Sequence, residues 1–166
     1  MEKREKSIEL LNKAVGEELT AVNQYMYFHF RCEDRGYDPL AKLFKKNSIK
    51  EMQHIEMLAE RILFLKGDVE MKQSAAVEKI HDVEGMLKKA KALEDGSITH
   101  YNEWAKECST HNDSISKQLF EKLVADEETH YDEFDIEIDN MGEFGENYLA
   151  LQSIVRSNKA GAGVEE

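Results

Sequence analysis

The residues of this sequence best suited to chemistry are two copies of the motif Glu-x-x-His. Glu51 and His54 form the first copy, and Glu127 and His130 form the second. Residues three apart on a helix have Cβ atoms about 5–6 Å apart on one face, so each carboxylate and imidazole can bind the same metal ion. A single copy is usually only solvated helix surface, so the indication of a metal site comes from the second, matching copy.

The two motifs belong to an internal repeat with an offset of 76 residues. The same offset aligns Glu18 with Glu94 and Tyr25 with Tyr101. It also aligns apolar residues: Leu11 with Leu87, Ala14 with Ala90, Cys32 with Cys108, Phe44 with Phe120, and Ile62 with Ile138. Chance readily matches apolar residues at helical spacing, but it does not readily match Glu, Glu-x-x-His and Tyr together. We therefore expect two copies of one helical hairpin, related by a pseudo-twofold axis.

Such an axis would gather four carboxylates and two imidazoles in the interior of one helical bundle. Buried carboxylates without partners strongly destabilise a fold, whereas two divalent cations would balance four of them. An oxygen-rich site with one nitrogen ligand per metal is typical of iron or manganese, although zinc could also bind. The predicted metal ligands and catalytic residues are Glu18, Glu51, His54, Glu94, Glu127 and His130.

Each ligand has an expected role. Glu51 and Glu127 would bridge the two metals. One site would be completed by Glu18 and His54, and the other by Glu94 and His130. Tyr25 and Tyr101 lie about two turns beyond their glutamates on the same helix face, so each could hydrogen-bond a ligating carboxylate, with plain core packing as the alternative.

The elements that must position these residues are predicted to be helices, because the chain has one proline and no long alternation of apolar and polar residues. The first expected helix runs from Lys6 to Asp34, and the second from Pro39 to Lys66, with Asp38 as its N-cap and Gly67 as its stop. The third begins at the N-cap Asp82 and ends at His111, and the fourth runs from Asp113 or Ser114 to Asn140. A short fifth helix is expected in "MGEFGENYLALQSIVRS". The fold class is therefore all-α.

The chain topology follows from the lengths of the connections. Short turns join the first helix to the second and the third to the fourth, whereas residues 68–81 can span the length of a bundle. A four-helix bundle with one long crossover between helices two and three is the ferritin-like topology. We expect one ferritin-like domain over residues 1–157 and a disordered C-terminal tail over residues 158–166.

Composition narrows the function classes. The formal net charge of −12 disfavours nucleic-acid binding. No apolar run is long enough for a membrane span and "MEKREKS" lacks the apolar part of a signal peptide, so we expect a cytoplasmic protein without a membrane partner. The two cysteines should lie at opposite ends of the bundle as free thiols. The unmatched histidines, which are read as surface or packing residues, are His29, His81, His100 and His111.

The chain resembles a bacterioferritin along nearly all of its length, through "LLNKAVGEELTAVNQY", "EMQHIEMLAERILFLKG", "LVADEETHYDEF" and "NYLALQ". All six predicted ligands match the family's dinuclear iron centre. The resemblance implies oxidation of Fe(II) by dioxygen or hydrogen peroxide and storage of ferric mineral in a hollow homo-oligomer of 24 subunits built from twofold dimers. It also implies b-type haem at the subunit dimer interface, and a ferredoxin-type reductant for iron release.

Met52 is interpreted through this resemblance. It lies about 100° around the helix from Glu51, facing away from the centre, and it breaks the repeat because the matching residue is Glu128. Its position matches the family's haem-ligating methionine, whereas simple packing in a dimer interface is the alternative. The residues expected to line the haem pocket are Leu19, Val22, Asn23 and Met26.

Two lysines depart from the family pattern. Lys46 and Lys50 stand where some bacterioferritins carry histidine and acidic groups for an additional iron site on the inner surface. Iron would then pass directly through the dinuclear centre. Two other functions stay open: a rubrerythrin-like di-iron peroxidase, disfavoured by the missing cysteine module, and a non-catalytic helical bundle.

Overall fold

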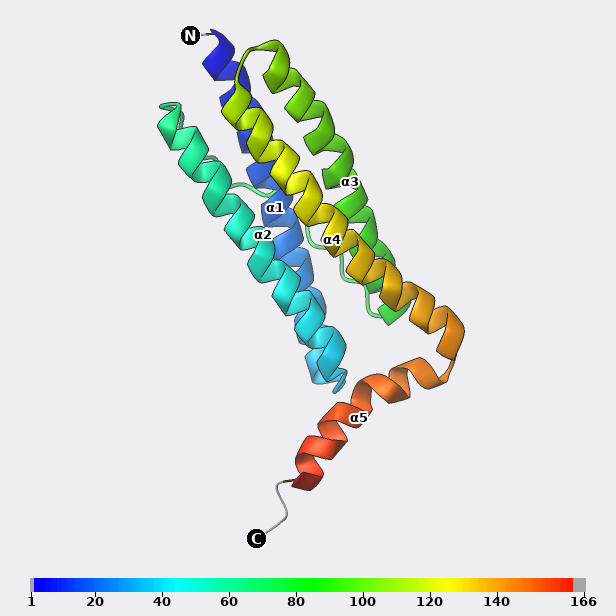
Figure 1. Cartoon of the computed structure of the whole chain (residues 1–166). Helices are drawn as coiled ribbons and strands as arrows, with labels where there is room; N and C mark the ends of the chain where they lie inside the picture. Colours follow the sequence, from blue (N-terminus) through cyan, green and yellow to red (C-terminus); the bar gives the residue numbers. More distant parts are fainter. Residues whose placement is uncertain (1, 163–166) are drawn as a thin grey trace.

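The computed structural model describes residues 2–162, which form helices and connecting segments without any strand. The helices are α1 (Glu2–Asp34), α2 (Asp38–Phe64), α3 (Val83–Thr110), α4 (Ser114–Phe144) and α5 (Asn147–Ala162). The first four lie side by side in an elongated bundle, and α5 leaves the end opposite the N-terminus at an angle (Figure 1). The prediction of an all-α bundle with a fifth, C-terminal helix is confirmed.

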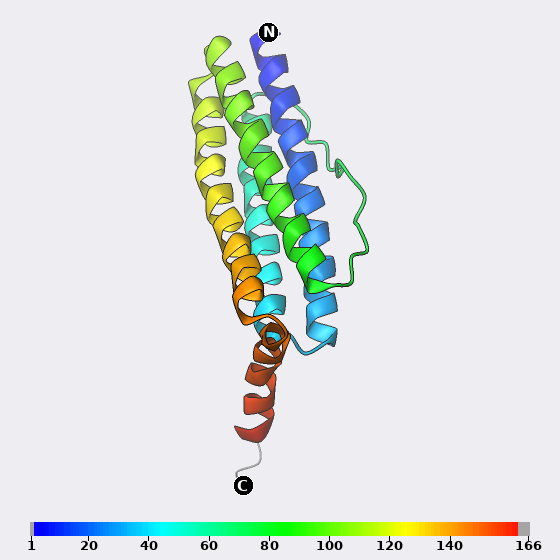
Figure 2. The same ribbon diagram turned by 90° about the vertical axis from the view of Figure 1, so that its right-hand side faces the viewer.

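The long connection between α2 and α3 runs along the bundle beside α1, which confirms the expected crossover (Figure 2). Polar side chains on one face of α1 hold the connection there by hydrogen bonds. Asn12 hydrogen-bonds the backbone of Asp68 and Glu70. Thr20 accepts from the backbone amide of Ser74, and Gln24 hydrogen-bonds the backbone of Glu78. Gly16 continues this stripe, because a Cβ atom there would lie 2.6 Å from the Ser74 hydroxyl. The crossover is thereby fixed against one face of α1.

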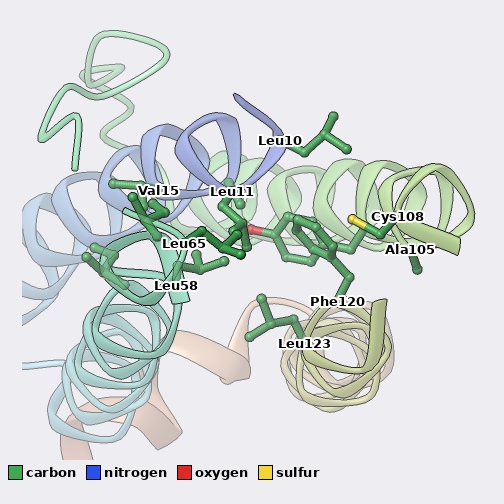
Figure 3. Packing of buried hydrophobic residues seen from close by; sticks show 13 residues of the cluster. Leu10, Leu11, Val15, Leu58, Leu65, Ala105, Cys108, Phe120 and Leu123 are labelled. Atoms are coloured by element: carbon green, nitrogen blue, oxygen red, sulfur yellow. The ribbon is translucent and has the colours of Figure 1, made fainter. Parts of the chain in front are cut away.

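Two apolar clusters fill the bundle. Figure 3 shows the first, to which all four long helices contribute; among its members are Leu11, Val15, Leu58, Phe120 and Leu123. The second cluster lies further along the bundle and includes Tyr25, Phe28, Phe44, Met86 and Phe134. In α1 the last buried residue of the first cluster is Val15 and the first of the second is Ala21, with Glu18 between them. In each of the other three helices, too, the ligand candidates lie between buried residues of the two clusters, so they form a polar layer between two apolar ones.

Helix ends differ from the prediction in several places. The N-cap of α2 is Tyr37 rather than Asp38, which lies in the first turn. At the other end of α2, Lys66 rather than Gly67 takes a left-handed conformation (φ 65°). Gly67 instead allows a close approach, since a Cβ atom there would lie 2.7 Å from the Ile8 side chain.

The C-terminal segments are more helical than expected. Helix α4 continues past Asn140 to Phe144, where Gly145 (φ 54°) ends it. Helix α5 continues to Ala162, so the tail predicted to be disordered from residue 158 is helical over 158–162. The rest of that tail, residues 163–166, lies outside the described residues.

Both cysteines are free and buried, as predicted. Cys108 belongs to the first apolar cluster and Cys32 to the second, so they lie in different layers of the bundle. Burial raises the pKa of the Cys32 thiol to about 12, which leaves it protonated and unreactive at neutral pH. Across residues 2–162, every helix is too short or too polar to span a bilayer.

Candidate metal centre

The structure brings all six predicted ligands together in the polar layer. Each of α1 and α3 contributes one glutamate, and each of α2 and α4 contributes a glutamate and a histidine one turn apart. All six are buried, and Glu51 and Glu127 are each only 1% exposed. Carboxylates are rarely buried this fully unless they are paired or bind metals.

The ligand atoms fall into two overlapping groups, within each of which they lie no more than 4.8 Å apart. The first group contains Glu18, Glu51, His54 and Glu127, and the second contains Glu51, Glu94, Glu127 and His130. Glu51 and Glu127 belong to both groups. This sharing is what two metal ions bridged by a pair of carboxylates require.

The histidines face the shared glutamates through Nδ1. His54 Nδ1 lies 2.9 Å from Glu51 Oε2 and 3.1 Å from Glu127 Oε1. His130 Nδ1 lies 2.9 Å from Glu51 Oε1 and 3.1 Å from Glu127 Oε2. The two imidazole rings stack at a centroid distance of 5.7 Å. The arrangement around one histidine is therefore repeated around the other, as the pseudo-twofold predicts.

Despite these close ion-pair contacts, several of the buried atoms form no well-aligned hydrogen bond among the described residues. They are both carboxylate oxygens of Glu51, Oε1 of Glu127 and Nδ1 of His54. Leaving buried polar atoms unpaired is costly, roughly 1–3 kcal/mol for each neutral group and more for a charged one. Hard oxygen donors with one imidazole per group fit divalent iron or manganese, so the donor set and its unpaired atoms suit a bound metal pair.

Burial and mutual repulsion set the protonation of the metal-free centre. Burial, together with the charges of Glu127 and Glu51, raises the pKa of Glu18 and Glu94 well above the usual range. Burial alone would lower the pKa of the histidines. The carboxylates that face them outweigh it, and the pKa rises to about 12 for His54 and to about 9 for His130. Protons therefore neutralise the centre without metal, and metal binding must release them.

Each tyrosine bonds the glutamate of the opposite hairpin. The Tyr101 hydroxyl donates to Glu18 Oε1 at 2.6 Å, and the Tyr25 hydroxyl donates to Glu94 Oε1. Both tyrosines thus hydrogen-bond candidate carboxylates, whereas their part in supporting bound metal stays a prediction. The exchange of partners across the bundle was not predicted, since sequence spacing places each tyrosine only relative to its own helix.

Two cavities reach the centre from opposite sides. The α1/α3 cavity, of about 160 Å³, is lined by the four central glutamates and by Glu17, Ala21, Ser74, Leu93, Ser97 and His100, among others. The α2/α4 cavity, of about 390 Å³, is lined by His54, His130, Lys46, Lys50, Gln53, Met57, Lys122, Asp126, Thr129 and Glu133. Lys46 and Lys50 thus lie beside the centre, where the departure from the family pattern was expected.

Met52 lies apart from the metal groups, and its side chain is 49% exposed on the surface of α2. Ile49, one turn earlier, is 43% exposed. The carbonyl of Val22 accepts a hydrogen bond from Ser48, which brings α1 beside this part of α2. Asn23 donates to Gln73 of the crossover at 2.6 Å. The haem roles of Met52, Leu19, Val22, Asn23 and Met26 stay predictions.

Two features near the centre were missed by the sequence analysis. Asp126 Oδ2 lies 3.5 Å from His54 Nε2, and His100 Nδ1 lies 2.7 Å from Glu17 Oε1 in the α1/α3 cavity. His100, read from sequence as a surface or packing residue, lines that cavity. Neither pair is repeated in the other half of the chain, so the internal repeat gave no signal for them.

The fold and this pair of carboxylate–histidine groups define the class of ferritin-like proteins. A family model described as a ferritin-like domain matches residues 8–143. The bacterioferritin of Brucella melitensis is 37% identical over 142 residues, which cover 85% of this chain and 88% of the relative. That of Desulfovibrio desulfuricans is 32% identical, covering 90% and 83%. The chain belongs to the bacterioferritin family.

Solved structures agree with this assignment. The crystal structure of the Desulfovibrio desulfuricans bacterioferritin, described as showing its di-iron site in different catalytic states, superposes with a TM-score of 0.89 at 32% identity over 92% of this chain and 89% of that one. The Mycobacterium tuberculosis bacterioferritin gives a TM-score of 0.84 at 29% identity, covering 88% and 92%.

Proposed function

We propose that this protein is a ferroxidase that oxidises Fe(II) to Fe(III) at the buried centre and stores the ferric product in a hollow oligomeric shell. The observation that supports it best is the pair of carboxylate–histidine groups that share Glu51 and Glu127. Membership of the bacterioferritin family and the di-iron site named for the Desulfovibrio desulfuricans relative support iron over other metals.

The chain's own residues would divide the work as the geometry suggests. Glu51 and Glu127 would bridge two iron ions, while Glu18 with His54 and Glu94 with His130 would hold one each. Bound iron supplies the redox chemistry, and the two electrons lost by two Fe(II) ions match the reduction of dioxygen to hydrogen peroxide or of peroxide to water. Tyr25 and Tyr101 would orient the terminal carboxylates by their hydrogen bonds.

Storage requires assembly, and the surface of the subunit offers suitable contacts. Exposed apolar residues on the bundle and on α5 include Phe30, Ile49, Met52, Leu151, Ile154 and Val155. Such residues on a subunit are typical of surfaces that bind partners. We propose twofold dimers assembled into a shell of 24 subunits, in the cytoplasm, with a ferredoxin-type reductant for iron release, as the family resemblance implies.

Aerobic addition of Fe(II) to the purified protein tests the proposal. Storage predicts rapid oxidation followed by mineral growth far beyond two irons per subunit, measured as iron content of size-separated particles. Turnover with hydrogen peroxide but without mineral would favour the peroxidase alternative. A protein that neither oxidises iron nor gains stability from it would be the non-catalytic bundle.

Haem binding is a separate proposal, because Met52 is exposed on α2 and lies outside the metal groups. Two copies of Met52, facing each other across a twofold interface, would ligate one haem through their sulfur atoms. Visible absorbance of protein purified with haem should show the low-spin bands of this ligation, and Met52→Leu should abolish them. Met57→Leu, a matched change on another face of α2, should keep these bands. Equal spectra for both variants would contradict the proposal.

A further inference from the structure

A second, smaller carboxylate–histidine pair lies in the α1/α3 cavity. Glu17 precedes the central ligand Glu18 on α1, and His100 precedes Tyr101 on α3. His100 Nδ1 lies 2.7 Å from Glu17 Oε1, and both residues line the same cavity as the central glutamates. The pair thus connects α1 and α3 on the side of the centre that faces the crossover.

The local geometry resembles that of the centre itself. There, too, each histidine presents Nδ1 to carboxylate oxygens at about 3 Å, as His54 does to Glu51 at 2.9 Å. Glu17 Oε2 is shielded from solvent and has no hydrogen-bond partner among the described residues, so one oxygen is unused. The His100 ring is held by stacking on Trp104, at 5.4 Å between centroids and 18° between planes. Both donors are therefore positioned before any ligand arrives.

The two cavities differ in charge. Five glutamates and not a single lysine or arginine line the α1/α3 cavity in the described chain. The α2/α4 cavity is lined by three lysines and only two carboxylates: Lys46, Lys50 and Lys122 against Asp126 and Glu133. A cleft lined by one sign of charge concentrates ions of the other sign, so cations are drawn to the α1/α3 side. A volume of about 160 Å³ also leaves room for several waters, since about 10–15 Å³ admits one.

We propose that Glu17 and His100 form a third metal site, which binds a divalent first-row cation at the entrance of the α1/α3 cavity. Exposure decreases from the surface toward the centre: the side chain of His100 is 47% exposed, that of Glu17 is 23% exposed and that of Glu18 is 2% exposed. Two protein ligands completed by water hold an ion weakly enough to let it move on to the centre. That the ion is Fe(II) rests on the proposed function.

The internal repeat limits this site to one per subunit. The residues that correspond to Glu17 and His100 are Leu93 and Gln24. Leucine offers no ligand, and the Gln24 amide is already engaged by both backbone groups of Glu78 in the crossover. A subunit would therefore bind three divalent ions, two in the centre and one at the entrance.

Titration of the metal-free, assembled protein with Co(II) under anaerobic conditions tests this count. Co(II) is a suitable probe because similar ligands bind it somewhat more tightly than Fe(II), and it absorbs visible light. Metal content after equilibrium dialysis should give three ions per subunit for the wild-type protein. Glu17→Gln and His100→Gln should each give two. Two ions in the wild-type protein, or a third ion that persists in both variants, would overturn the site.

Glu107 and His111 supply the matched control, because they form a carboxylate–histidine pair at 3.0 Å outside the cavity. Glu107→Gln and His111→Gln should both keep three Co(II) ions. At limiting Fe(II), oxidation should be several-fold slower in Glu17→Gln than in Glu107→Gln, and the difference should shrink as Fe(II) is raised. A protein that binds the third Co(II) but does not oxidise iron would support the site while refuting the proposed function.

Discussion

The two hairpins of the bundle, α1 with α2 and α3 with α4, agree most closely where they meet. Glu18 and Glu94, Glu51 and Glu127, and His54 and His130 occupy equivalent places, and even the tyrosine–glutamate bonds are exchanged symmetrically. Away from that layer the hairpins still share several apolar residues but diverge at other positions. A site that binds a symmetric pair of ions constrains both copies equally, so the retained symmetry marks the chemistry of the centre.

The differences between the hairpins are equally informative. Met52 corresponds to Glu128, and the pair Glu17 and His100 corresponds to Leu93 and Gln24. Met52 lies on a surface proposed to face a partner subunit, whereas Glu17 and His100 meet between the two hairpins on the side of the crossover. Broken symmetry therefore points to tasks that the subunit performs once, whereas kept symmetry points to the paired metals.

The largest expected effect comes from removing either shared carboxylate. Glu51→Gln and Glu127→Gln should each lower the rate of Fe(II) oxidation by at least about 100-fold, because changes to residues that only support metal ligands already cost about 10- to 100-fold. The measurement is the initial rise in ferric absorbance after aerobic mixing. Glu128→Gln, an exposed neighbour on α4, is the control and should leave the rate unchanged. Strongly unequal losses in the two variants would contradict a symmetric centre.

The next effect tests the exchanged hydrogen bonds. Tyr25→Phe and Tyr101→Phe each leave a buried glutamate oxygen without its donor, so each should weaken metal binding by about 10- to 100-fold. Each should also lower the free energy of unfolding of the metal-free protein by about 1–3 kcal/mol. Calorimetric metal titration and urea unfolding give the two quantities. If only one tyrosine mattered, the hairpins would be similar in shape but different in function.

These tyrosines show what the sequence could and could not predict. The grouping of the six candidate ligands was predictable because helical spacing places Glu and His on one face and the repeat supports the pattern. The partner of each tyrosine was not, since it depends on how four helices pack. Glu17 and His100 gave no repeat signal at all, because they approach each other only across the α1–α3 interface. Spacing along one helix was predictable, whereas contacts between helices were not.

Metal removal should reverse the pH dependence of stability. In the folded, metal-free protein the pKa values of Glu18 and Glu94 are raised above the ordinary value of 4.5. Their protonated forms therefore stabilise the fold fully below pH 4.5, and this stabilisation is lost as the pH rises. The charged forms of His54 and His130 stabilise the fold fully below pH 6.5, the ordinary pKa of histidine. For His130 this stabilisation is lost as the pH rises through about 9. Metal binding requires the deprotonated forms, so it strengthens with pH.

The Tm of the metal-free protein should therefore fall between pH 5 and pH 8, and the Tm gain on adding metal should grow over the same range. A metal concentration 100 times the dissociation constant stabilises by about 2.7 kcal/mol for one site. Thermal unfolding followed by circular dichroism, with and without Co(II), measures both trends. Glu18→Gln should flatten the slope of the metal-free protein; a metal-free Tm that rises with pH would refute the assigned protonation.

The smallest effect concerns the lysines of the α2/α4 cavity. Lys46 and Lys122 are matched by the repeat, but Lys46 pairs with Glu133 whereas Lys122 pairs with Asp126 Oδ2 at 2.9 Å. That same oxygen lies 3.5 Å from His54 Nε2. Exposed ion pairs contribute about 0–1 kcal/mol, so Lys46→Ala and Lys122→Ala should both leave stability nearly unchanged.

Metal affinity should nevertheless separate the two variants. Lys122→Ala frees Asp126 Oδ2 to accept from His54, which orients the imidazole for metal binding. Co(II) affinity should therefore rise a few-fold in Lys122→Ala and stay constant in Lys46→Ala. The double variant Lys122→Ala with Asp126→Asn should lose the gain, because the amide oxygen is a weaker acceptor than the carboxylate. An equal response of the two single variants would mean that the symmetry of the hairpins extends from the centre into this cavity.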